Sequence, residues 1–155
     1  MLSEMLSKRG TELRVMNGYK FRMHKYLANE VERWVCTRKT CKTFFKSDVR
    51  GTMIEDNSDD HNHLPDSRQM LMRQSVSNAC KRQAKEDLFK RPSKVMRREI
   101  TADALSVLTE ADMTQVRKAI HSARAKERPP LPKTLDDLHI ILHEYDVKTK
   151  VGERF

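Results

Sequence analysis

Four side chains in the first half of the sequence are of the types that bind transition metals: Cys36, Cys41, His61 and His63. Two thiolates and two imidazoles form the ligand set of a closed, tetrahedral structural zinc site. One tight turn over the four residues between the cysteines can direct both sulfurs to the same ion. Alternate residues of an extended segment share a face, so the two histidines point the same way. The sequence therefore predicts one Zn²⁺ bound by these four residues.

Cysteines and histidines also occur in proteins without binding a metal. Cys36 and Cys41 can be small core residues, and the histidine pair can be a coincidence. The two cysteines can also form a disulfide, although nothing in the sequence marks the chain as secreted. The metal site is favoured because two of the six histidines are separated by one residue, and because two of the three cysteines closely follow the only tryptophan, Trp34.

The residues around the candidate ligands also form a longer pattern, over residues 10–66. Four runs make up the pattern: Asn17 to Phe21, Arg33 to Cys36, Cys41 with Lys42, and His61 to Pro65. This pattern resembles a FLYWCH-type zinc finger, whose architecture is similar to that of the WRKY and glial-cells-missing DNA-binding domains. Arg33 is a departure, because the family usually has an aromatic residue before the tryptophan. The resemblance implies a small antiparallel sheet closed by Zn²⁺ that associates with DNA or with chromatin proteins.

Alternating polar and apolar residues predict that the first half is all β. Asn17-Gly18 is a strong two-residue hairpin signal between two such stretches. Trp34 and Cys36 share a face of a regular strand, which predicts that the tryptophan covers the metal and excludes water. Residues 1–9 are expected to be a flexible N-terminus. The expected strands cover residues 12–16, 19–26, 31–36, 43–47 and 52–55.

After Pro65 the apolar residues recur at three- and four-residue steps, which predicts amphipathic helices over residues 67–146. Cys80 lies on the first apolar stripe and is expected to be buried rather than reactive. Thr101 and Thr109 are candidate helix caps. Residues 147–155 are expected to be loose. The predicted fold class is therefore α+β, a small zinc-bound sheet followed by an all-α segment. The expected helices cover residues 68–90, 95–108 (in one or two pieces), 109–126 and 134–143.

The formal net charge is +9, with 31 basic and 22 acidic residues, and most of the excess lies after Pro65. Basic proteins of this kind usually bind polyanions, so nucleic acid is the expected partner. The turn between the two cysteines holds its side chains near the metal and is the best local candidate for phosphate contacts. The candidate DNA-binding residues of the sheet are Lys20, Arg22, Arg38, Lys39 and Lys42.

The second half has a helix, a break, a second helix, a short turn and then a basic helix, which is the outline of a helix-turn-helix DNA-binding motif. In that interpretation residues 113–126 form the recognition helix. The alternative, which the sequence favours slightly, is that these basic side chains only solvate the outer face of a small helix bundle. The candidate DNA-binding residues of this helix are Arg117, Lys118 and Arg124.

Residues 66–155, ending in Val151 to Phe155, resemble the linker that follows a FLYWCH finger in Mutator-like element transposases. In those proteins a catalytic acidic-triad domain comes next, so the resemblance implies a fragment, a truncated relative or a domesticated DNA-binding remnant. No catalysis is expected from these residues. A site with four protein ligands has no open position for water, and the acidic cluster Glu55 to Asp60 lies in a predicted loop.

The sequence therefore predicts a nuclear, zinc-dependent DNA-binding protein that is transposase-derived or regulates transcription or chromatin. Its expected partner is double-stranded DNA. The alternative is a zinc-scaffolded protein-interaction module that binds chromatin or transposon-associated proteins, because a basic surface serves both functions. No apolar run is long enough to span a bilayer, and neither a membrane nor a small-molecule substrate is expected as a partner.

Overall fold

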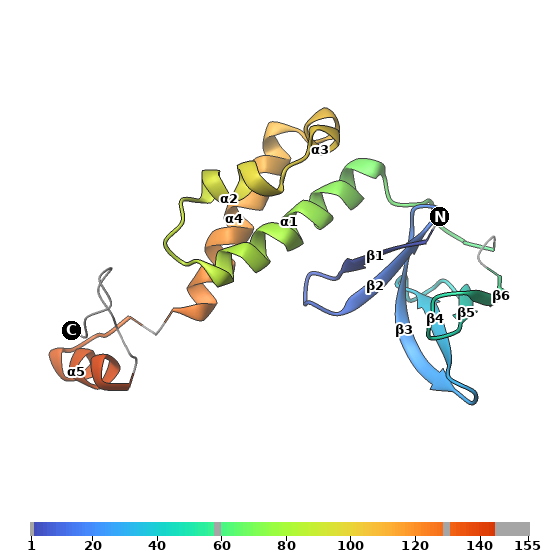
Figure 1. Cartoon of the computed structure of the whole chain (residues 1–155), viewed down its shortest axis with the longest axis horizontal. Coiled ribbons are helices and arrows are strands. Elements are labelled where there is room, and N and C mark those ends of the chain that lie inside the picture. Colours follow the sequence, from blue (N-terminus) through green and yellow to red (C-terminus); the bar gives the residue numbers. More distant parts are fainter. Residues whose placement is uncertain (1, 58–59, 129–130, 145–155) are drawn as a thin grey trace.

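The computed structural model describes residues 2–57, 60–128 and 131–144. In this part of the chain a curled antiparallel sheet is followed by helices, which confirms the predicted α+β class (Figure 1). Each strand pairs with the next one in the sequence, so the sheet is a simple meander. The strands are β1 (Leu2–Leu6), β2 (Glu12–Met16), β3 (Tyr19–Leu27), β4 (Val31–Cys36), β5 (Phe44–Ser47) and β6 (Met53–Asp56).

The Asn17-Gly18 turn joins β2 to β3, as its sequence predicts. Both residues have positive φ angles, 52° and 83°, which suit a tight hairpin turn. Gly18 also lies against the segment that follows the histidine pair. Its carbonyl accepts a hydrogen bond from the Asp66 amide at 2.9 Å, and a Cβ at Gly18 would be only 2.8 Å from the Cβ of Pro65. The hairpin therefore supports the chain just after the candidate ligands.

Large aromatic side chains fill one face of the sheet. Phe21, Trp34 and Phe45 lie on neighbouring strands and are almost completely buried. The Trp34 indole donates a hydrogen bond to a Glu32 carboxylate oxygen at 3.0 Å, and its ring lies 4.3 Å from the Arg14 guanidinium. Arg14 and Glu32, which both contact Trp34, form an ion pair at 2.9 Å. Each charge is thus buried beside an opposite charge, which limits the cost of removing it from water.

The N-terminus differs from its prediction. Residues 1–9 were expected to be flexible, but Leu2–Leu6 forms β1 and pairs antiparallel with β2, with Leu2 opposite Met16 and Leu6 opposite Glu12. The expectation was wrong because β1 has a weak hydrophobic pattern and only its first and fourth residues are partly buried. β1 is held in place by its backbone pairing with β2, whose hydrophobic pattern is strong. The sequence of β1 alone does not show this pairing.

The helices follow the predicted order with small changes at their ends. The predicted helix over residues 95–108 is two helices, and the Thr101 hydroxyl accepts a hydrogen bond from the Ala104 amide at the start of the second. Thr109 and Asp112 form a complete capping box at the start of the next helix. The helices are α1 (Arg68–Glu86), α2 (Pro92–Glu99), α3 (Ala102–Val107), α4 (Glu110–Glu127) and α5 (Leu135–Glu144).

A second hydrophobic core lies between α1, α2, α3 and α4. Cys80 is fully buried there, as predicted, and burial, with a smaller contribution from Glu99, raises the pKa of its thiol to about 11. This thiol is therefore a core side chain rather than a reactive one. The buried residues of this core are Val76, Cys80, Ala84, Val95, Met96, Ala104, Val116 and Ile120.

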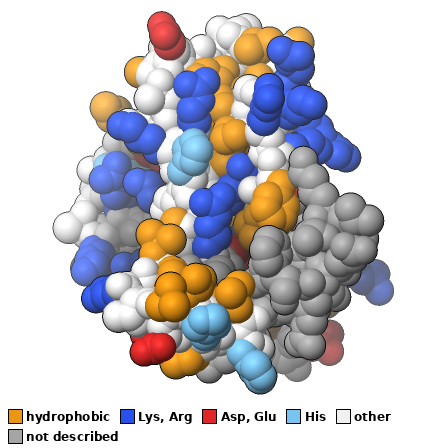
Figure 2. Space-filling model, turned by 90° about the vertical axis from the view of Figure 1, so that its left-hand side faces the viewer, with side chains coloured by type: hydrophobic (Ala, Val, Ile, Leu, Met, Phe, Trp, Pro, Cys, Tyr) orange, Lys and Arg blue, Asp and Glu red, His pale blue; other side chains and the backbone are white. Residues whose placement is uncertain are grey.

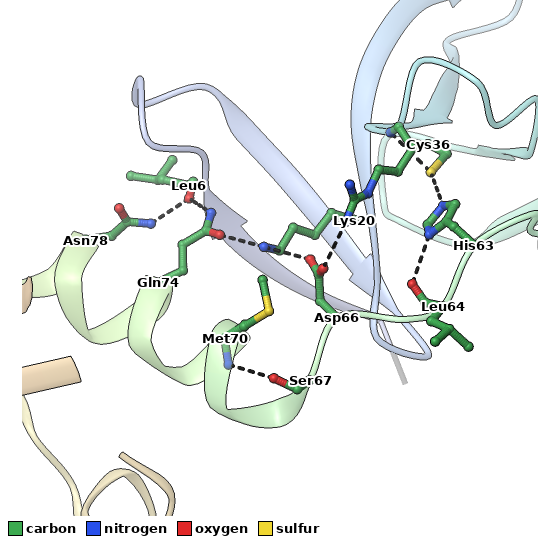
Figure 3. A network of polar contacts seen from close by, with 11 residues as sticks. Leu6, Lys20, Cys36, His63, Leu64, Asp66, Ser67, Met70, Gln74 and Asn78 are labelled. Carbon is green, nitrogen blue, oxygen red and sulfur yellow. Dashed lines mark hydrogen bonds and ion pairs between the residues drawn. The ribbon is translucent and has the colours of Figure 1, made fainter. Parts of the chain in front are cut away.

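Side-chain contacts join the sheet to α1 (Figure 3). Gln74 of α1 accepts a hydrogen bond from the Lys20 ammonium at 2.7 Å and donates one to the Leu6 carbonyl at 2.7 Å. Asn78, one helical turn later, donates to the same Leu6 carbonyl at 2.6 Å. Lys20 also pairs with Asp66 at 2.9 Å, just before α1 begins. The metal-ligand half and the helical half are therefore in direct contact through hydrogen-bonded side chains.

The last described helix, α5, lies apart from α1–α4 (Figure 1). The region 147–155, expected to be loose, falls outside the described residues. Within the described ranges, no helix is both long and apolar enough to cross a membrane.

Candidate metal centre

The four predicted ligands converge on one point of the structure. Cys36 ends β4, Cys41 lies in the loop before β5, and His61 and His63 lie in the segment between β6 and α1. One potential ligand atom from each residue lies within 4.8 Å of the other three. All three cysteines are free thiols, so the disulfide alternative is excluded in this structure. The residues form a Cys2His2 group that can bind a metal ion.

Two of the sulfur–nitrogen separations are close to those expected around a single tetrahedral ion. The Cys36 sulfur lies 3.2 Å from Nε2 of His63, and the Cys41 sulfur lies 3.2 Å from Nδ1 of His61. Bond lengths of about 2.3 Å to sulfur and 2.0–2.1 Å to nitrogen place the ligands of a tetrahedral zinc ion about 3.3–3.8 Å apart. These two separations are just below this range, and all four donor atoms lie within 4.8 Å of one another, so one ion could be bound by all four residues after their side chains adjust.

The loop between the cysteines is held by backbone hydrogen bonds. The Cys36 amide donates to the Thr43 carbonyl at 3.0 Å, and the Cys41 amide donates to the Arg38 carbonyl at 3.0 Å. The Arg38 amide donates a hydrogen bond to the Cys36 sulfur at 3.5 Å, which stabilises the thiolate form of Cys36. Asn62, between the two histidines, is exposed, and its amide group donates to the Thr40 carbonyl at 3.0 Å. This last bond ties the histidine segment to the cysteine loop.

Each histidine is oriented by a second contact. The Leu64 carbonyl accepts a hydrogen bond from Nδ1 of His63 at 2.9 Å, which leaves the lone pair of Nε2 directed at Cys36 (Figure 3). The His61 ring stacks on Tyr19, with ring centroids 3.5 Å apart and planes only 4° from parallel. These contacts orient the two rings toward the cysteine sulfurs, and ligands that are held in place lose less entropy when they bind an ion.

Thr43 is a residue of this centre that the sequence did not reveal. Its hydroxyl is buried and lies 2.8 Å from the Cys41 sulfur and 3.0 Å from Nδ1 of His61. A hydroxyl in this position can donate a hydrogen bond to the thiolate and so orient the ligand. The only sequence signal was its position two residues after Cys41, and a threonine there has no distinctive chemistry.

The two thiols differ in acidity. Burial raises the pKa of the Cys36 thiol, and the neighbouring Cys41 adds to the effect. Burial also acts on Cys41, but hydrogen bonds from the Thr43 side chain and backbone and from the Asn62 backbone outweigh it and lower the pKa of that thiol to about 7. The Cys41 sulfur is therefore the more readily ionised metal ligand.

The surroundings of the centre are those of a structural site. Trp34 lies on the same face of β4 as Cys36 and packs in one hydrophobic cluster with both cysteines, as predicted. A metal ion bound by all four residues would have no open coordination position for a reacting water.

The predicted DNA-binding residues of the sheet have different environments. Arg22, Lys39 and Lys42 are exposed, and the Arg38 side chain is 61% exposed with its guanidinium 4.0 Å from Asp66. Lys20 differs, because its side chain is only 14% exposed and contacts Asp66 and Gln74 between the two halves. The exposed side chains can reach a ligand directly, whereas Lys20 mainly holds the structure together.

The predicted DNA-binding residues of α4 also divide. Arg117 and Lys118 are exposed, but Arg124 is buried, so the prediction that it faces solvent was wrong. Its guanidinium donates to the carbonyls of Ala84 (3.4 Å), Asp87 (2.9 Å) and Lys90 (2.5 Å), at and beyond the end of α1. Arg124 is four residues after Ile120 on the buried face of α4. Its charge is satisfied by carbonyl groups that have no helical partner.

Comparisons with known proteins add no identification, because no family model, no curated protein and no solved structure matches the chain. The fold and the site define its class: an α+β protein with a candidate Cys2His2 metal centre.

Proposed function

We propose that the protein is a zinc-dependent DNA-binding protein in which Zn²⁺, held by Cys36, Cys41, His61 and His63, is a structural ion. The observation that supports this most is the convergence of four donor atoms within 4.8 Å. Two sulfur and two nitrogen ligands favour zinc over magnesium or calcium, which prefer oxygen. The ion holds the cysteine loop against the histidine segment.

The distribution of charge supports DNA as the ligand. The chain has a formal net charge of +9, and the loop held by the two cysteines carries Arg38 and Lys39, both exposed. Arg22 and Lys42 are exposed on the same half of the protein, and Arg117 and Lys118 on α4. Contacts to phosphates are the expected use of most of these side chains, since they position a protein on DNA without reading its sequence.

The proposal extends to cellular role. The residues that resemble a FLYWCH-type finger support a nuclear regulator of transcription or chromatin, or a transposase-derived protein, that binds double-stranded DNA without catalysing a reaction. The closed ligand set supports the absence of catalysis at the metal, because it offers no open coordination position.

The first experiment measures zinc content and DNA binding of the same protein. We expect one Zn²⁺ per chain and a DNA affinity that falls with salt, with a log–log slope of about −0.9 for each phosphate neutralised. His63→Ala should remove the zinc and weaken DNA binding. His121→Ala, the same change on the exposed face of α4, should leave both unchanged. Protein that contains no zinc, or duplex binding that is absent or independent of salt, would contradict the proposal.

A protein-interaction module scaffolded by zinc is the second candidate function. It is favoured by hydrophobic side chains that α5 exposes: Leu135, Leu138, Ile140 and Leu142. In Figure 2 hydrophobic side chains gather in the lower part of the view, where α5 lies, with Lys and Arg side chains around and above them. Chromatin or transposon-associated proteins are the proposed partners. This function predicts a partner that remains bound after nuclease treatment and little affinity of the purified protein for DNA.

A further inference from the structure

The β1–β2 hairpin and the α1–α4 pair enclose two adjoining cavities. The first has a volume of about 580 Å³ and extends from Arg38 in the cysteine loop to α1 and α4. The second, of about 690 Å³, lies between the tip of the hairpin and the later turns of α1 and α4. Lys8, Asn78, Lys81 and Ala119 line both cavities, so the two form one continuous groove. We call it the basic groove.

The charge of the second cavity of the basic groove is strongly one-sided, because six basic and no acidic residues line it. In the first cavity Asp66 lies beside Lys20 and Arg38. Within the described ranges, five of these six side chains have no ion pair with a carboxylate, and only Lys85 has one, with Glu127 at 2.5 Å. The hairpin, α1 and α4 each contribute to this set, so residues far apart in the sequence bring their charges together. The six are Lys8, Arg9, Lys81, Arg82, Lys85 and Lys126.

Four residues that line the groove form a hydrogen-bond network. Leu6, Gln74, Asn78 and Lys20 are linked by hydrogen bonds of 2.6–2.7 Å (Figure 3). This network fixes the distance between the hairpin and α1, and therefore between the two basic walls. Repulsion between like charges destabilises a compact state unless a counter-charge is present. A rigid cleft with unpaired cations on both sides therefore suits an anionic ligand.

The lining also indicates which polyanion fits. No Phe, Tyr or Trp lines either cavity among the described residues. Proteins that bind single-stranded nucleic acid generally stack bases on aromatic side chains, whereas Lys and Arg suffice for the phosphates of a duplex backbone. The composition of the groove therefore favours one backbone of duplex DNA over an unpaired strand.

We propose that the basic groove is the main phosphate-binding surface of the protein, and that Arg38 connects it to the metal-held cysteine loop. One strand of a DNA duplex would follow the groove from the cysteine loop to the far ends of α1 and α4. The inference rests on the proposed DNA-binding function. It assigns most of the binding to residues outside the metal-ligand half.

The test compares two triple variants of the full chain with zinc bound. The groove variant is Lys81→Gln/Arg82→Gln/Lys126→Gln. The control is Lys94→Gln/Arg97→Gln/Arg98→Gln, which removes the same charge from exposed positions on α2 that line neither cavity. A slope of −0.9 per phosphate corresponds to about fivefold in affinity per contact at 0.15 M salt, so three lost contacts predict roughly 100-fold weaker binding. The log–log salt slope should become shallower by almost three.

A second variant tests the opposite wall. Lys8→Gln/Arg9→Gln, in the hairpin turn, should weaken duplex binding by roughly 25-fold by the same reasoning. Circular dichroism verifies that each variant keeps its helices. If the wild type binds duplex DNA with a steep salt dependence but both groove variants bind like the control, the groove assignment is wrong and the proposed function stands. If the wild type itself does not bind duplex DNA, both proposals fail.

Discussion

Substitution of Gly18 by alanine tests whether the hairpin supports the metal centre. Gly18 has a φ of +83°, and an added Cβ would be 2.8 Å from the Cβ of Pro65. Two costs are therefore expected. The positive φ costs an alanine about 1–2 kcal/mol. The overlap with Pro65 costs about 1–3 kcal/mol more, because the proline ring is joined to the backbone and cannot swing away as a flexible side chain would.

Gly51→Ala is the matched control. Gly51 has a φ of +84°, and no atom lies within 4 Å of the position of an added Cβ. Alanine at Gly51 therefore has the cost of the positive φ without the overlap. The difference between the two variants measures how tightly the hairpin is packed on Pro65.

The overlap should also affect the metal. Pro65 is two residues after His63, whose Nε2 lies 3.2 Å from the Cys36 sulfur. If the displacement of Pro65 is transmitted to His63, the additional 1–3 kcal/mol corresponds to about 5- to 150-fold weaker zinc binding than in Gly51→Ala. Unfolding by urea at a fixed zinc concentration gives the stability, and competition with a chromophoric chelator gives the zinc affinity. Equal losses in the two variants would refute the argument that this hairpin supports the ligands.

Two further predictions concern the helical half. Arg124→Met removes the buried guanidinium from the end of α1 and should lower the free energy of unfolding by roughly 1.5–3 kcal/mol. The control Arg117→Met, on the exposed face of α4, should change the free energy of unfolding by less than about 0.5 kcal/mol. Urea unfolding, followed by the circular dichroism of the helices, compares the two variants, and equal effects would contradict the burial of Arg124. Hydrogen bonds from Gln69, from Thr109 and from Arg73 hold the pKa of Asp112 well below its usual range. Its stabilising effect should therefore be complete above about pH 5 and decline as the pH falls below the unfolded pKa of about 3.9. Asp112→Asn should be less stable at pH 7 and approach the wild type in acid, and a difference that does not change with pH would refute this.

The ligand half could be predicted well because its signals are local. The Asn17-Gly18 turn and the alternation in residues 12–16 and 31–36 indicated strand ends that the structure reproduces. Thiols and imidazoles are rare enough that their spacing alone identified the four residues that meet. β1 was missed because its position depends on pairing with β2 rather than on its own side chains.

The burial of Arg124 and the position of the basic groove could not be predicted from the sequence. A charged residue in an amphipathic helix is assumed to face solvent, and only the position of the α1 C-terminus shows that Arg124 has carbonyl partners inside the fold. The groove depends in the same way on the distance between the hairpin and α1, which the contacts of Gln74 and Asn78 with the Leu6 carbonyl determine. The side-chain amides that determine this distance are uncharged, but they also determine where the basic side chains of three separate segments come together. The net charge of +9 predicts a polyanion as partner, but where the basic side chains gather on the surface depends on those few hydrogen bonds between uncharged groups.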